Sequence, residues 1–138
     1  CNRREISGSR LWGLFQNYFE YPEKFFRNHF VINYCPLMFL EETGRNRTPD
    51  KLPPEKRTLL FRHCDDYLKS MIRIVNPTWL VGIGVFATKA IRRVSSNINP
   101  GNRPCSIQIL HPSPASPAAN RGWAEITTKT LEKAGIWP

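Results

Sequence analysis

The chain has 138 residues, of which 41% are hydrophobic, and this length suffices for one domain with a hydrophobic core. No apolar run approaches the roughly 18 residues of a membrane-spanning helix, and the longest, residues 79–87, contains two glycines. The net charge of +9 favours a polyanionic partner, most simply nucleic acid. A basic protein without such a partner would carry the same charge, so charge alone does not decide between the two.

The chain begins at Cys1 rather than at a methionine, and we expect it to be a fragment of a longer protein. It has three further cysteines, Cys35, Cys64 and Cys105, and no pair has the C-x-x-C spacing. This spacing gives little support to a zinc ribbon or an iron–sulfur framework. We expect reduced thiols, as in an intracellular protein.

The first third of the chain alternates helical and extended patterns. Residues 9–20 place apolar side chains at helical spacing, with Ser9 as the expected N-cap, and a proline begins a short helix over residues 22–26. Residues 30–34 are β-prone and are closed by Pro36, which predicts a strand. The glycine, asparagine and prolines of residues 41–54 indicate a loop.

The rest of the chain repeats a helix–strand alternation. An apolar stripe predicts a long helix from Pro54 to the Asn-Pro pair at 76–77. Further predicted elements are a strand over 79–83, a helix over 86–95, a turn-rich loop over 97–104, a strand over 105–110 and a helix over 123–134 closed by Gly135. Such alternation predicts parallel strands joined by right-handed crossovers.

The carboxyl ends of the three predicted strands carry Asn33, Gly84 and His111. Ligands of open parallel sheets bind outside these ends. If the strands are neighbours, a planar amide and an imidazole face one cleft, and the glycine leaves room between them. His111 is followed by a loop with three prolines, residues 112–122, which is held to a limited set of shapes.

Other motifs have simpler interpretations. The pair Gly82 and Gly84 lacks the third glycine and the following acid of a dinucleotide-binding fingerprint, so close helix–strand packing is favoured. His111 and Ser113 lack a nucleophile elbow and an orienting acid, which argues against a hydrolase triad.

Several polar residues are expected to have structural or surface roles. His29 and His63 have no partners at metal-ligand spacing, and Asp65 and Asp66 point in different directions on a helix. The cysteine at position 35 is interpreted as a buried small residue. The basic residues of the 45–47 loop and Arg121 could gather into an edge that contacts phosphates.

Two motifs in this order resemble the single-strand-selective monofunctional uracil-DNA glycosylases. They are Asn33-Tyr34-Cys35-Pro36-Leu37 and His111-Pro112-Ser113-Pro114, the second followed by Pro117, Ala119-Asn120 and Gly122-Trp123. Supporting stretches are Ser7-Gly8-Ser9-Arg10-Leu11-Trp12-Gly13, Gly44-Arg45-Asn46 with Thr48-Pro49, Leu52-Pro53 and Val81-Gly82-Ile83-Gly84. The resemblance spans nearly the whole chain.

The resemblance implies an α/β, three-layer uracil-DNA glycosylase fold, with a parallel four-stranded sheet flanked by helices. Residues 1–138 would form the C-terminal part of one such domain, without its first motif-bearing strand. The implied activity is excision of uracil and 5-hydroxymethyluracil from single- and double-stranded DNA, by base flipping and hydrolysis of the N-glycosidic bond in base excision repair. The family implies no metal, no cofactor and no membrane partner, and a monomer in the nucleus.

The same resemblance assigns roles to residues. Asn33 matches the family's uracil-reading asparagine and His111 its catalytic histidine. A loop that wedges into the duplex corresponds to the DNA-binding residues Pro112, Ser113, Pro114, Ala115, Ser116, Pro117, Ala118, Ala119, Asn120, Arg121 and Gly122.

The chain departs from the family pattern in two places. The Gly-Met-Asn-Pro-type motif, whose asparagine positions the attacking water, is missing, and its strand would precede Cys1. We therefore expect these 138 residues alone to be inactive and unstable. In the wedge loop, Ala115 and Ser116 stand where the family usually has Arg-Asn, and this should weaken insertion into duplex more than binding to single strands.

Two alternatives remain open at this stage. One is a catalytically dead nucleic-acid-binding module of the same fold, which the intact Asn33 and His111 disfavour. The other is a different branch of the superfamily, although the cysteine spacing does not match the iron–sulfur branch.

Overall fold

The computed structural model describes residues 5–45, 47–98 and 100–138, so Cys1 and Asn46 lie outside the described residues. The main elements are α1 (Ile6–Phe19), α2 (Pro22–Phe26), α3 (Pro54–Val75), β1 (Trp79–Ile83), α4 (Gly84–Ser95), β2 (Cys105–Ile109) and α5 (Trp123–Lys133). Short 3₁₀ turns lie at η1 (Pro49–Lys51), η2 (Pro100–Asn102) and η3 (Ala119–Arg121).

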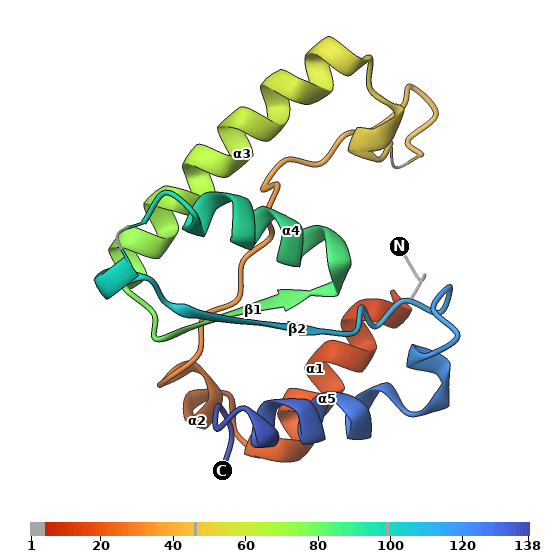
Figure 1. The fold of residues 1–138 in the computed structure, drawn as a ribbon. Coiled ribbons are helices and arrows are strands. Elements are labelled where there is room, and N and C mark those ends of the chain that lie inside the picture. The colour runs from red at the N-terminus through yellow and green to blue at the C-terminus, as the bar shows by residue number, and fades with distance from the viewer. Residues whose placement is uncertain (1–4, 46, 99) are drawn as a thin grey trace.

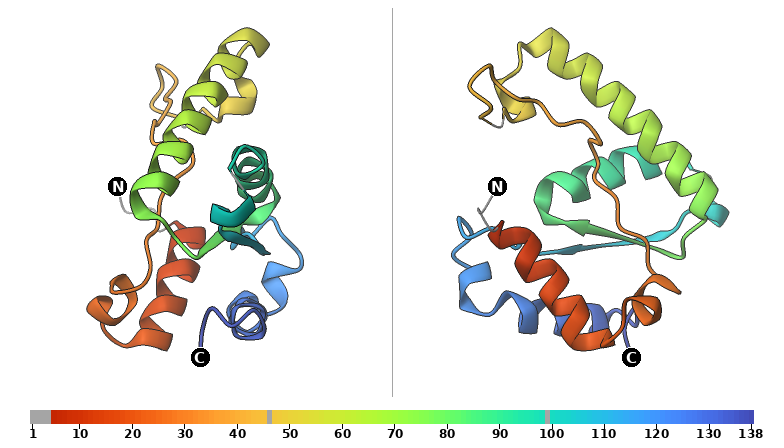
Figure 2. Two further views of the ribbon diagram at one scale, coloured as in Figure 1. Left: turned by 60° about the vertical axis from the view of Figure 1, so that its left-hand side comes forward. Right: turned by 180° about the vertical axis from the view of Figure 1, so that it is seen from behind.

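The sheet lies between two pairs of helices (Figures 1 and 2). β1 and β2 are parallel, and their register runs from Trp79 opposite Cys105 to Ile83 opposite Ile109. Helices α3 and α4 cover one face, and α1 and α5 cover the other (Figure 1). The predicted α/β class and the parallel pairing of these strands are thus confirmed, with a sheet of two strands in the described part of the chain.

Each face of the sheet has its own apolar core, because alternate residues of a strand point to opposite faces. The core under α1 and α5 is built from Leu14, Ile109, Ala119, Trp123, Leu131 and Trp137. The core under α3 and α4 is built from Leu68, Ile72, Ala90, Ile91 and Val94. The first of these cores also anchors the end of β2, where the motif around His111 begins.

Helix α4 packs so closely on β1 that glycine is required at the contact. A Cβ atom at Gly82 would lie 2.3 Å from Oγ1 of Thr88 and 2.8 Å from its Cα atom. The Thr88 hydroxyl donates a hydrogen bond of 2.8 Å to the carbonyl oxygen of Gly84. The interpretation of the glycines as permitting close helix–strand packing is therefore confirmed for Gly82.

The strand predicted over residues 30–34 is wrong. This stretch (orange in Figures 1 and 2) forms an irregular connection that crosses the molecule from α2 toward α3. A β-strand needs a neighbouring strand for its ladder hydrogen bonds. The described sheet consists of β1 and β2, and residues 30–34 pair with neither. Ile32 and Tyr34 instead pack against the core under α3 and α4.

Two helices begin earlier than predicted, whereas α2, α3 and α5 begin at the predicted residues. Helix α1 begins at Ile6 with Glu5 in the N-cap position, so Ser9 lies inside the helix and is not its cap. Helix α4 begins at Gly84, directly after β1 and two residues earlier than predicted. Gly135 follows the last helix with a φ of +71°, as its predicted C-terminal position requires. No described helix combines the length and apolarity needed to cross a membrane.

His29 has a structural role, as predicted. Its Nδ1 atom lies 2.9 Å from the carbonyl oxygen of Phe25, and its Nε2 atom accepts a hydrogen bond of 3.1 Å from the indole of Trp137. The imidazole stacks on the Phe25 ring at a centroid distance of 4.6 Å. The ring thereby fastens the C-terminal segment to α2.

Candidate active site

Gly84 and His111 meet just beyond the paired ends of β1 and β2. Ile83 lies opposite Ile109 in the register, so the residues that follow them leave the sheet at the same edge. A Cβ atom at Gly84 would stand 3.0 Å from the Cβ of His111 and 3.3 Å from its Cδ2. Gly84 therefore leaves space for the imidazole of His111, whereas the predicted room between His111 and the amide of Asn33 stays a prediction.

The imidazole of His111 has a defined hydrogen-bonding state. Its Nδ1 atom accepts a hydrogen bond of 3.2 Å from the backbone N–H of Ser113. A neutral imidazole with an accepting Nδ1 carries its proton on Nε2. Because the His111 side chain is exposed, its Nε2–H can donate to a group outside the protein.

The geometry gives no support to a serine nucleophile. The hydroxyl of Ser113 accepts a hydrogen bond of 3.2 Å from the backbone N–H of Ala115. An activated serine would instead donate its hydroxyl proton to the histidine. His111 and Ser113 therefore interact through the backbone amide and not as a nucleophile and its base.

The loop after His111 is folded on itself. Asn120 donates from its side-chain amide to the carbonyl oxygen of Pro114 at 2.8 Å, and its backbone N–H donates to Ser116 O at 3.1 Å. Ala119 is buried in the core under α1 and α5. Trp123 closes the loop, because its indole N–H donates to the carbonyl oxygen of Leu110 at 2.7 Å. The loop therefore has one shape fixed at both ends.

Sequence reasoning missed Arg10, which clamps this loop from α1. Its Nη1 atom donates to the carbonyl oxygen of Pro112 at 3.1 Å, and its Nη2 donates to Oδ1 of Asn120 at 2.9 Å. These contacts span more than 100 residues of sequence, so no local pattern signals them. Arg10 appeared in the sequence only as one member of a supporting motif.

Asn33 lies on the irregular connection, and its side chain is exposed. Among the described residues, no hydrogen bond joins Asn33 to His111, so their meeting across one cleft stays a prediction. A chain of contacts nevertheless leads toward the histidine. The ring of Tyr34, next to Asn33, packs edge-on against Phe86 at 5.5 Å, and Phe86 lies two residues after Gly84 on α4.

The remaining candidate residues behave as structural or surface groups. Burial raises the pKa of Cys64 to about 11, which leaves a thiol and not a reactive thiolate at neutral pH. Cys35 is half-buried rather than buried, and His63 is exposed. Cys35, Cys64 and Cys105 are free of disulfides. Asp65 is bound by a guanidinium and forms no carboxylate dyad with its neighbour.

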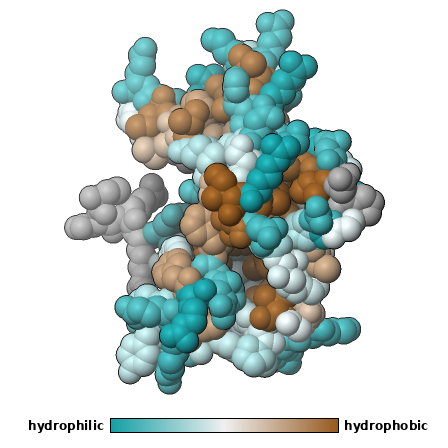
Figure 3. All heavy atoms as spheres, turned by 90° about the vertical axis from the view of Figure 1, so that its left-hand side faces the viewer, coloured by the Kyte–Doolittle hydropathy of each residue, from teal (hydrophilic) through white to brown (hydrophobic). Residues whose placement is uncertain are grey.

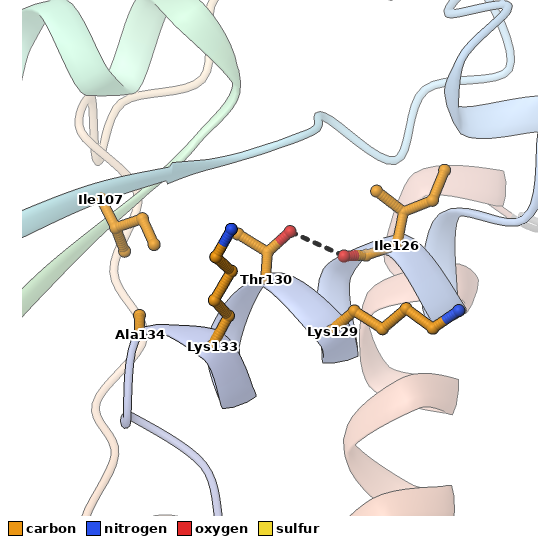
Figure 4. Close-up of a pocket in the computed structure, with 6 residues that line it drawn as sticks. All are labelled: Ile107, Ile126, Lys129, Thr130, Lys133 and Ala134. Atoms are coloured by element: carbon orange, nitrogen blue, oxygen red, sulfur yellow. Dashed lines mark hydrogen bonds between the residues drawn. The ribbon is translucent and has the colours of Figure 1, made fainter.

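A hollow lies between β2 and α5 (Figure 4). Its lining residues are Ile107, Ile126, Lys129, Thr130, Lys133 and Ala134. The Thr130 hydroxyl donates to Ile126 O at 2.7 Å, and Lys129 pairs with Glu125 at 2.6 Å. The hollow contains none of the predicted site residues. Within residues 5–45, 47–98 and 100–138, no group of three or more His, Cys, Asp or Glu side chains could hold a metal ion.

No family model matches the chain. Curated proteins do match it along its whole length. It is 39% identical over 141 residues to the single-strand selective monofunctional uracil DNA glycosylase of Bos taurus, and it covers 50% of that protein. It is 38% identical to the corresponding proteins of Rattus norvegicus and Mus musculus, each covered to 49%.

These matches agree with the family resemblance that was inferred from the two sequence motifs around Asn33 and His111. The chain spans about half the length of the curated relatives it matches. The α/β fold with its parallel strands is consistent with such a portion of a uracil-DNA glycosylase domain. Over its whole length the chain is therefore similar to about half of the length of curated single-strand-selective monofunctional uracil-DNA glycosylases.

Proposed function

We propose that the protein containing this chain excises uracil and 5-hydroxymethyluracil from single- and double-stranded DNA during base excision repair. The observation that supports this most directly is the state of His111 at the end of β2. Its Nδ1 atom accepts from the Ser113 amide, which leaves Nε2 to carry the proton of a neutral imidazole on an exposed side chain. The relatives' names supply the reaction class, a monofunctional uracil-DNA glycosylase.

His111 stabilises the departing base in this proposal. Breaking the N-glycosidic bond leaves negative charge on uracil and positive character on the sugar. The Nε2–H donor of a neutral His111 binds uracil O2 as that charge develops. A fixed donor aimed at a developing oxyanion is typically worth about 100- to 1,000-fold in rate.

Asn33 selects uracil over cytosine. Its carbonyl oxygen accepts from uracil N3–H, and its amide donates to uracil O4. Cytosine reverses both polarities, and each mismatched buried group costs about 1–3 kcal/mol. The target base must leave the helical stack to reach such a pocket.

The loop from Pro112 to Gly122 fills the gap that the flipped base leaves. Its internal hydrogen bonds and the Arg10 clamp give it a fixed shape before DNA binds. Ala115 is exposed on this loop, and it replaces the longer basic side chain usual in the family. We expect Ala115→Arg to raise excision from duplex DNA more than excision from single strands, and an equal effect on both would contradict this role.

We further propose that the 138 residues alone do not excise uracil. Large apolar side chains of the described part are exposed, among them Phe30, Leu37, Met38, Ile74 and Phe86. Figure 3 shows apolar residues gathered in the middle and in the upper part of one face, among hydrophilic residues. Large exposed apolar patches mark interaction surfaces. The remaining half of the relatives' length would cover this surface and supply the group that positions the water.

An excision assay tests these proposals together. Oligonucleotides with a single uracil or 5-hydroxymethyluracil, single- and double-stranded, are incubated with the 138-residue chain and with the full-length protein. We expect the full-length protein to release both bases and the chain alone to release neither. A full-length protein that binds these oligonucleotides and releases no base would instead be a nucleic-acid-binding module. We expect the protein to act as a monomer in the nucleus.

A further inference from the structure

The segment that carries Asn33 has little backbone support. Between residues 30 and 38, no backbone N–H bonds to another backbone group within the described part of the chain. Regular strands obtain their rigidity from such bonds. The position of Asn33 therefore depends on the side chains of its neighbours.

Tyr34 provides the main attachment. Its ring packs edge-on against Phe86 on α4 at 5.5 Å and lies 6.1 Å from the ring of Phe61 on α3. Ile32, on the other side of Asn33, packs against the same core between α3 and α4. Asn33 is thus held between two anchored neighbours while its own side chain stays exposed.

The hydroxyl of Tyr34 joins an ion pair that links α3 to α4. It donates to Oδ1 of Asp65 at 2.8 Å, and it accepts from Nη2 of Arg93 at 3.1 Å. Arg93 also grips both carboxylate oxygens of Asp65, through Nε and Nη2, each at 2.7 Å. Such bidentate pairs fix geometry as well as charge.

The ionisation states agree with this arrangement. The hydrogen bond from Arg93 lowers the pKa of Asp65, so the carboxylate is charged and accepts from both partners. Burial raises the pKa of Tyr34, so the phenol keeps the proton that it donates. At neutral pH the three groups form one satisfied network.

We propose that Tyr34, Asp65 and Arg93 are positioning residues that hold Asn33 in the orientation needed to read the target base. This inference rests on the proposed role of Asn33. Because a planar amide discriminates uracil from cytosine by the direction of its two polar ends, a loosely held Asn33 would lose discrimination as well as affinity. The network therefore acts on KM and on base selectivity, while His111 acts on the rate of bond cleavage.

The test compares Tyr34→Phe with Tyr18→Phe in the full-length glycosylase. Each change removes one phenolic hydroxyl and keeps its ring, and the Tyr18 hydroxyl donates to Pro138 O at 2.7 Å, on the other face of the sheet. For Tyr34→Phe we expect kcat/KM on uracil to fall at least about tenfold, mainly through KM, because the hydroxyl's hydrogen bonds to the charged groups of Asp65 and Arg93 are both lost. Discrimination against cytosine should fall in parallel. Tyr18→Phe should leave both unchanged.

A second readout separates this inference from the proposed function. Amide hydrogen exchange over residues 30–35 should accelerate in Tyr34→Phe and not in Tyr18→Phe, whether or not the protein releases uracil. Asp65→Asn keeps an acceptor for the Tyr34 hydroxyl, so its selectivity should lie between that of wild type and that of Asp65→Ala. Equal exchange rates and equal selectivity in Tyr34→Phe and Tyr18→Phe would overturn the proposal. Failure of the wild-type protein to excise uracil would overturn the function and leave the exchange result valid.

Discussion

Replacing Gly84 with alanine is expected to disturb the candidate active site far more than the same change at Gly135. Both glycines have a left-handed backbone, with φ of +86° at Gly84 and +71° at Gly135. An L-residue in this region costs about 1–2 kcal/mol. Both variants bear that backbone cost. The difference between their losses in free energy of unfolding therefore reports the contacts of the new methyl group.

The surroundings differ sharply. At Gly84 the added Cβ would stand 3.0 Å from the Cβ of His111, whereas nothing lies within 4 Å of it at Gly135. Overpacking a tight site typically costs about 1–3 kcal/mol. We therefore expect the free energy of unfolding to fall by about 2–5 kcal/mol in Gly84→Ala and by about 1–2 kcal/mol in Gly135→Ala.

The assay has two parts, urea unfolding and single-turnover release of uracil by the full-length protein. In Gly84→Ala the imidazole of His111 must move by a few tenths of an ångström, which should slow release by about tenfold even where the protein remains folded. Gly135→Ala should release uracil at the wild-type rate. Equal stability losses and equal release rates in the two variants would refute the assigned contact.

Three further predictions follow from other contacts. Arg10→Met keeps an aliphatic side chain but removes two hydrogen bonds to the loop. Amide hydrogen exchange over residues 112–122 should therefore accelerate, and excision from duplex DNA should fall about fivefold. Unchanged exchange in this loop would contradict the role of Arg10. His29→Phe leaves the indole N–H of Trp137 without its acceptor and should lower the unfolding free energy by about 1–3 kcal/mol in urea, whereas no loss would mean that this bond contributes nothing. Asp65 has a lowered pKa in the folded protein, so its stabilisation is present above its unfolded pKa of about 3.9 and is lost as pH falls through the lower folded value. Because Arg93 is half exposed, this contribution is about 1 kcal/mol or less, and unfolding followed between pH 6 and pH 2 should show a shallower acid loss in Asp65→Asn than in wild type.

Elements with a strong local signal were predictable from the sequence. The apolar stripe of α3, the strand–glycine–helix run of β1 and α4, and Gly135 after α5 depend on residues close to each other in the chain. The strand predicted over residues 30–34 failed because β propensity does not by itself provide a pairing partner. Whether such a stretch forms a strand depends on what lies beside it in the folded chain.

The candidate site was predictable only in part, for the same reason. The position of His111 at a strand end followed from local pattern and is confirmed by the register of β1 and β2. Arg10 and the Tyr34 network join segments separated by between 28 and 110 residues, and charge and aromatic content give no hint of such pairing. Only the folded arrangement shows that α1 holds the loop after His111 and that α3 and α4 hold the segment of Asn33.

The most direct test of the account is the rate of uracil release by the full-length protein after His111 is replaced by alanine. The backbone N–H of Ser113 donates to Nδ1 of His111, which leaves Nε2 as the proposed donor to uracil O2. We predict a loss of about 100- to 1,000-fold in the single-turnover rate, with binding to uracil-containing DNA largely retained. Release at the wild-type rate by this variant would contradict the central claim.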